Sequence, residues 1–89
     1  MKTKPGFLLR SVSGINIVAP VGMSSLNFNG VIKLNDSGAF LWEKLEKGAT
    51  EDEMTAALLN HYDDVDEPTA RDSVRDFVKV LRDAEILDD

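Results

Sequence analysis

The spacing of apolar residues changes at Asn35, and this change constrains the fold more than any other feature of the chain. Residues 31–34 alternate between two faces, the pattern of a strand with one buried side. After Asn35, apolar residues such as Leu41 and Leu45 recur at helical spacing. Asn35 is itself a favourable N-cap residue, and Asp36 places a negative charge in the first turn, where it suits the helix dipole. The sequence therefore predicts a strand that continues into a helix with a single residue as the joint.

Two further strands are predicted before this joint. Phe7 to Val12 and Ile15 to Ala19 are rich in β-forming residues and flank Ser13-Gly14, which indicates a hairpin with a two-residue turn. Pro20 is expected to end the second strand because proline has no backbone N–H to donate. Residues 1–5 are expected to form a loose end.

The third strand is placed at residues 31–34, with residues 26–29 extended before it. The alternative is one longer strand with a bulge at Gly30, because Asn29-Gly30 is also a turn signal. Both versions leave the strand directly before the joint at Asn35. We therefore expect three strands within about residues 7–34.

Three helices are predicted after the joint, at about residues 36–47, 51–62 and 67–85. Gly48 is expected just beyond the first helix, and Thr50 and Glu53 form a capping box for the second. The chain of 89 residues is long enough for one core, so residues 1–89 are predicted to form a single domain. The predicted class is α+β, a small winged helix-turn-helix with a three-stranded antiparallel sheet followed by three helices. Trp42 and Phe77 lie on the apolar stripes of their helices and are expected to be buried.

The sequence contains no set of residues typical of a catalytic site. His61 is the single histidine, and its place at the end of a predicted helix favours ring packing over catalysis. The chain has no cysteine, which excludes thiol nucleophiles and thiolate metal sites. The acidic residues 63–67 lack the spacing and the glycine of a calcium-binding loop, and no phosphate-binding glycine motif is present. We therefore predict neither an enzyme nor a bound cofactor or metal.

Charge and hydropathy bear on location and partners. The net charge of −6 opposes binding to the phosphate backbone of nucleic acids. No apolar run is long enough to span a membrane, and the N-terminal residues lack the apolar segment of a signal peptide. The absence of cysteine is compatible with a reducing compartment. We expect a cytoplasmic protein without a membrane partner.

Two features of the predicted fold concern binding. A helix-turn-helix that follows strands able to form a wing is typical of DNA-binding domains. However, the basic side chains of the third helix are interleaved with aspartates, which indicates a solvated face with ion pairs within the helix. A three-stranded sheet also exposes at least one strand edge. If the third strand is that edge, an extended peptide can add beside it, next to the third helix. A second copy of the chain could use the same edge to form a dimer.

Four motifs occur in a fixed order from residue 34 onward. They are Leu34-Asn35 with Gly38-Ala39 and Leu41-Trp42, then Gly48 with Thr50 and Glu53, then Tyr62-Asp63, and finally Val74, Phe77, Val78 and Leu81. In their joint order and spacing these motifs resemble the PqqD family, named for pyrroloquinoline quinone biosynthesis protein D. The resemblance covers nearly the whole chain.

This resemblance implies a non-catalytic recognition domain for ribosomally synthesised, post-translationally modified peptides. Such a domain captures the leader of a precursor peptide as an extra strand between the third strand and the third helix. It then presents the peptide to a modifying enzyme, often a radical S-adenosylmethionine enzyme. The implied partners are the leader peptide and that enzyme, and the chain is expected to be a monomer or a weak homodimer.

The peptide site is placed on the third strand and one flank of the third helix. The predicted site residues are Val31, Ile32, Lys33, Thr69, Ser73, Asp76, Phe77 and Val80. The opposite flank, with Arg71, Arg75 and Arg82, is the alternative wall and would suit an acidic leader. Two positions depart from the family pattern: Ser73 stands where aspartate is frequent, and Glu85 stands where glycine is common.

Overall fold

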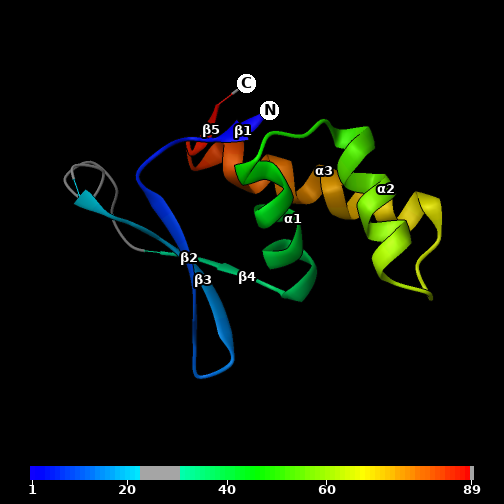
Figure 1. Cartoon of the computed structure of the whole chain (residues 1–89), viewed down its shortest axis with the longest axis horizontal. Helices are drawn as coiled ribbons and strands as arrows, with labels where there is room; N and C mark the ends of the chain where they lie inside the picture. Colours follow the sequence, from blue (N-terminus) through cyan, green and yellow to red (C-terminus); the bar gives the residue numbers. More distant parts are fainter. Residues whose placement is uncertain (23–30, 89) are drawn as a thin grey trace.

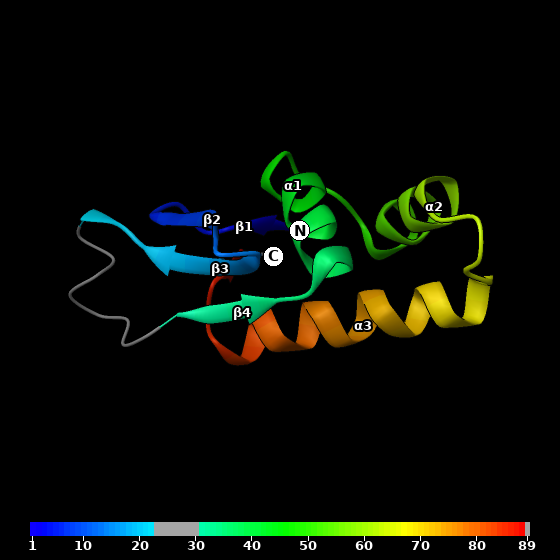
Figure 2. The same ribbon diagram turned by 90° about the horizontal axis from the view of Figure 1, so that it is seen from below.

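The computed structural model describes residues 1–22 and 31–88. Strands β2 (Phe7–Val12), β3 (Ile15–Pro20) and β4 (Ile32–Leu34) form an antiparallel sheet with β3 in the middle (Figure 1). Helices α1 (Asp36–Glu46), α2 (Glu51–His61) and α3 (Glu67–Asp83) follow. Figure 2 shows the strands gathered at one end of the molecule, α2 at the other end, and α3 running lengthwise between them. The predicted α+β fold of three strands followed by three helices is confirmed.

The β2–β3 hairpin closes through the predicted two-residue turn. Ser13 and Gly14 have φ angles of 53° and 80°, and two positive φ angles in succession match the twist that such hairpins need. The prediction that Pro20 lies outside the second strand is wrong, because Pro20 pairs with Phe7 at the end of the ladder. Among the described strands β4 pairs with β3 only as far as Val18, so at Pro20 the strand has a partner on one side only. A missing N–H at that position need not interrupt a ladder.

The third strand is shorter than predicted. It begins at Ile32, and Val31 precedes it with an exposed side chain. The expectations of an extended segment at residues 26–29 and of a bulge at Gly30 both fall outside the described residues.

The N-terminus is not a loose end, which corrects the prediction. Strand β1 (Lys2–Thr3) pairs antiparallel with β5 (Leu87–Asp88), and the two termini lie together in Figure 1. The Lys4 backbone N–H donates to the Ile86 carbonyl at 3.0 Å, which extends this pairing beyond the ladder. The Met1 carbonyl also accepts a hydrogen bond from Ala49 at 2.9 Å, so the N-terminus is tied to the α1–α2 connection as well.

All three helices begin where the sequence predicts and end one or two residues earlier. The N-caps are Asn35, Thr50 and Asp66, each accepting a backbone hydrogen bond through its side chain. Gly48 has a φ of 91° directly after the C-cap of α1, as predicted. Helix α3 ends at Asp83 instead of Glu85, because Glu85 adopts a left-handed conformation with a φ of 60°.

One core lies between the sheet and the helices. Trp42 from α1 is fully buried and Phe77 from α3 is 6% exposed, as predicted. Val18 is the most buried residue of the sheet, and Ile86 brings the C-terminal segment into the same core. The inner face of the sheet therefore packs on α1 and α3, which fixes the position of β4 relative to α3.

Candidate functional site

The free edge of β4 is the starting point for a binding site. In the described sheet β4 pairs with β3 through Ile32–Val18, Lys33–Ile17 and Leu34–Asn16, and has no strand on its other side. Ile32 and Leu34 face inward and pack partly buried against the core, whereas Lys33 is exposed on the opposite face. An edge of this kind presents backbone N–H and C=O groups that another extended segment can pair with.

The joint between β4 and α1 holds this edge in place. The Asn35 side-chain oxygen accepts hydrogen bonds from the Gly38 N–H at 2.8 Å and the Ser37 hydroxyl at 3.0 Å. Asn16 of β3 donates to the Asp36 carboxylate at 3.2 Å, which links the sheet to the first turn of α1. Strand edge and helix start therefore form one rigid corner.

A hollow lies between this corner and α3. It has a volume of about 230 Å³ and is lined from three elements: β4, the start of α1, and one flank of α3. The lining residues are Lys33, Leu34, Asn35, Ser37, Gly38, Leu41, Ser73, Asp76, Phe77 and Val80. Phe77 presents only 6% of its surface, whereas Val80 is 45% exposed at the side of the hollow. The hollow thus combines an apolar wall with neutral polar groups and the Asp76 carboxylate, and Lys33 borders it from a position whose side chain lies on the opposite face of the sheet.

A second hollow continues from the first toward α2. Asn35, Ser37 and Ser73 line both, and the second has a volume of about 360 Å³. Its apolar lining comes from Leu58, Tyr62 and Val65, with Thr69 from the first turn of α3. We refer to the two hollows together as the groove.

The groove brings together six of the eight predicted site residues. Lys33, Ser73, Asp76, Phe77 and Val80 line the first hollow, and Thr69 and Ser73 line the second. Val31 and Ile32 line neither. Sequence reasoning missed the contributions of the α1 start and of Tyr62, because Asn35 and Gly38 were interpreted as capping and packing residues only. The position of Asn35, between the end of a strand and the start of a helix, is the sequence feature that could have predicted this part of the lining.

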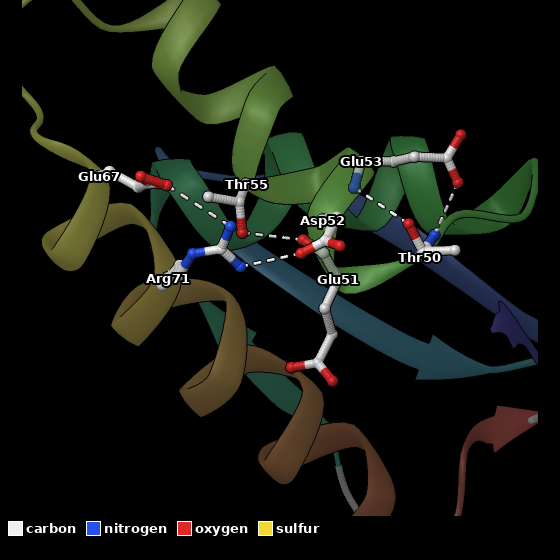
Figure 3. Close-up of polar contacts among 7 residues, drawn as sticks. All are labelled: Thr50, Glu51, Asp52, Glu53, Thr55, Glu67 and Arg71. Carbon is white, nitrogen blue, oxygen red and sulfur yellow. Dashed lines mark hydrogen bonds and ion pairs between the residues drawn. The ribbon is translucent and has the colours of Figure 1, made fainter.

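The opposite flank of α3 differs in charge and shape. Arg71 donates to Asp52 of α2 at 2.8 Å and pairs with Glu67 at 3.5 Å (Figure 3). The hydrogen bond and the charge of Asp52 raise the pKa of Arg71 above its usual value. Arg75 pairs with Asp72 at 3.1 Å. Arg71 and Arg75 line a separate shallow hollow together with Glu67 and Asp72, and Arg82 lies outside it. Carboxylates of the chain itself therefore already surround two cations of the alternative wall.

His61 takes part in an aromatic cluster on the surface. Its ring stacks on Phe40 at a centroid distance of 4.3 Å and meets Tyr62 edge-on at 4.8 Å. The Lys44 ammonium lies 5.1 Å from the centre of the Phe40 ring. This arrangement confirms ring packing at the end of α2. Within residues 1–22 and 31–88 no group of three or more histidine, aspartate and glutamate side chains is placed to hold a metal ion. In the same residues no helix is long and apolar enough to cross a bilayer.

Two of three comparisons with known proteins gave a match, one to a family and one to a fold. The sequence profile of the family described as coenzyme PQQ synthesis protein D (PqqD) matches residues 17–87. Among solved structures, TbiB1 in complex with the TbiA(beta) leader peptide has a similar fold, with a TM-score of 0.75 and 24% sequence identity. The similarity covers 99% of this chain and 95% of TbiB1. No curated protein sequence matches the chain.

Proposed function

The chain belongs to the family of coenzyme PQQ synthesis protein D, and from this premise we propose that it is a non-catalytic adaptor that binds the leader of a ribosomally synthesised precursor peptide. The observation that carries the proposal is the free edge of β4 beside the groove. The solved complex of TbiB1 with a leader peptide supports it, because the two folds are similar. In this proposal the adaptor presents the bound peptide to a modifying enzyme, of the radical S-adenosylmethionine type. The cytoplasm, where precursor peptides are made, is the proposed location.

Strand addition at β4 is the proposed binding mode. The three residues Ile32–Leu34 supply backbone donors and acceptors, and alternate side chains of the added strand point into the groove. Phe77, Val80 and Leu41 offer an apolar contact surface there. The lining of the groove carries the carboxylates of Asp36 and Asp76, whereas the Lys33 side chain lies on the opposite face of β4, so the groove favours an apolar segment over a strongly acidic one.

The second hollow, at Tyr62, provides a further contact for the peptide beyond the end of β4. Its apolar lining from Leu58, Tyr62 and Val65 suits one bulky side chain of the leader. Because the edge of β4 points toward Asn35, an added strand that follows the edge reaches this hollow at one end. Backbone pairing then supplies affinity, and the two hollows supply selectivity.

Titration with a synthetic precursor leader peptide, such as the TbiA(beta) leader found in the TbiB1 complex, tests the proposal. Val80→Arg places a long charged side chain at the side of the first hollow, and we expect a loss of leader affinity of roughly tenfold or more. Asn60→Arg adds the same charge at an exposed position of α2 outside the groove and should bind like the unaltered protein. Amide resonances of residues 31–34 and of α3 should shift on binding. Shifts gathered on residues 51–56, or equal affinities for the two variants, would place the site elsewhere.

A further inference from the structure

The outer face of the β2–β3–β4 sheet is exposed and apolar. Residues directly opposite one another in antiparallel strands share a face. The register pairs Leu8 with Ala19, Arg10 with Ile17, Val12 with Ile15, and Ile17 with Lys33. These side chains therefore lie on one face, opposite the core-facing Leu9, Val18 and Ile32.

The exposure of this outer face is unusual for β-branched and leucine side chains. Leu8, Val12 and Ile15 are 44%, 54% and 48% exposed. Among the described residues the other large hydrophobic side chains with comparable exposure are Val31 and Val80, both near the β4 edge or the groove. The hairpin also extends away from the helices, as Figure 1 shows. In the described part of the chain the exposed apolar side chains are thus concentrated at the proposed leader site and on the sheet face next to it, the pattern of an interaction surface.

The charges on the outer face narrow down the partner. Among the residues that the structure describes, Arg10 and Lys33 are the charged side chains on it, and both are cations in a chain with a net charge of −6. A surface that combines an apolar patch with carboxylates at its rim is complementary to this face. A second copy bound by two-fold symmetry would bring the cations of one copy near those of the other. An anionic membrane would be repelled by the net charge of the domain.

We propose that the outer face of the sheet docks the modifying enzyme, through an apolar patch on that enzyme with carboxylates at its rim. This inference rests on the proposed function. A leader strand added beside β4 extends the same sheet. Alternate side chains of that leader strand therefore lie on the face that carries Lys33. An enzyme on this face therefore lies directly beside the captured peptide. The groove binds the peptide and the outer face binds the protein that acts on it.

Binding to an immobilised modifying enzyme that acts on the precursor of the bound leader tests the docking face. The variant Val12→Glu with Ile15→Glu puts two carboxylates on the outer face next to the hairpin turn, and neither residue lines the groove. We expect enzyme binding to weaken by roughly tenfold or more, with leader affinity within about twofold of the unaltered protein. Ala56→Glu with Asn60→Glu is the matched control, because it adds the same charge at exposed positions of α2. This control should bind both partners normally.

Arg10→Glu is a second variant that leaves the apolar side chains unchanged. It should slow association with the enzyme and reduce the salt dependence of binding, because it reverses a cation at the interface. Normal enzyme binding by both face variants would overturn the docking proposal. If the protein floats with vesicles of equimolar phosphatidylcholine and phosphatidylglycerol, the docking proposal is overturned in favour of a membrane. If the protein self-associates and Val12→Glu with Ile15→Glu abolishes this, the proposal is overturned in favour of a second copy. If the unaltered protein fails to bind the leader but binds the enzyme through this face, the proposed function fails and the docking face stands.

Discussion

Glu85 occupies a backbone conformation that most side chains avoid. Its φ of 60° lies in the left-handed region, directly after the C-cap of α3. The Glu85 N–H donates to the Arg82 carbonyl and the Ile86 N–H donates to the Leu81 carbonyl, both at 3.0 Å. This is the Schellman arrangement, in which glycine is preferred at the position of Glu85. Glu85 in place of the glycine common in the family therefore lowers the stability of the fold but does not change the path of the backbone.

Glu85→Gly should stabilise the protein. Removing Cβ relieves the left-handed strain, and the greater freedom of glycine in the unfolded chain offsets part of the gain, so we expect a net increase of about 0.5–1 kcal/mol in the free energy of unfolding. Urea unfolding followed by the fluorescence of Trp42 measures it. Glu85→Ala keeps the strain and is the control. Equal stabilities of the two variants would show that the conformation of residue 85 costs nothing.

Trp42 is the largest side chain of the core and is fully buried. Trp42→Ala should lower the free energy of unfolding by about 3–5 kcal/mol, which is comparable to the whole stability of a domain of this size. Circular dichroism and a two-dimensional NMR spectrum measure the loss of folded protein. The Trp42 Nε1–H has no hydrogen-bond partner among the described residues. Trp42→Phe therefore breaks no hydrogen bond, and we expect it to remain folded; a well-folded alanine variant would contradict the core assignment.

At the scale of elements, the joint between β4 and α1 can be tested apart from the peptide. Asn35 holds the first turn of α1 through the Gly38 N–H. Asn35→Ala removes this cap and should cost about 1 kcal/mol of unfolding free energy, whereas Asn35→Asp keeps an acceptor and should cost much less. Thermal unfolding without peptide compares the two. An alanine variant as stable as the aspartate variant would mean that packing alone fixes this corner.

The same joint shows how far sequence alone reaches. The change of periodicity at Asn35, the capping box at Thr50 and the hairpin turn at Ser13-Gly14 are local signals, and each element they predict is present. Pro20 was misjudged because its tolerance depends on how far β4 extends along β3, which is a tertiary fact. Helical periodicity left two flanks of α3 as candidate walls, and the hollows beside β4 lie on the flank with Thr69, Ser73 and Val80. The lining from Asn35, Gly38 and Tyr62 did not, because each of these residues also has a sufficient local explanation.

At the scale of the whole molecule, the pairing of the two termini is what sequence reasoning missed most clearly. Strands of two residues carry no periodicity, and the partners Thr3 and Leu87 are at opposite ends of the chain. The pairing matters because Ile86 and Leu87 belong to the core. It also holds the C-terminal end of α3, and α3 forms one wall of the groove. The stability of the groove is thus linked to the chain ends.

Lys4→Pro tests this link without shortening the chain. Proline cannot donate to the Ile86 carbonyl, so the 3.0 Å hydrogen bond beside the β1–β5 ladder is lost. We expect a decrease of about 1–3 kcal/mol in the free energy of unfolding, because a carbonyl in this pairing loses its partner. Lys4→Ala keeps the backbone N–H and should be close to neutral. Hydrogen exchange should be faster at Asp88 in the proline variant only, because its N–H faces β1 in this register. If exchange and stability are unchanged, the termini do not hold α3, and the groove is maintained by the packing of α1 against α3 alone.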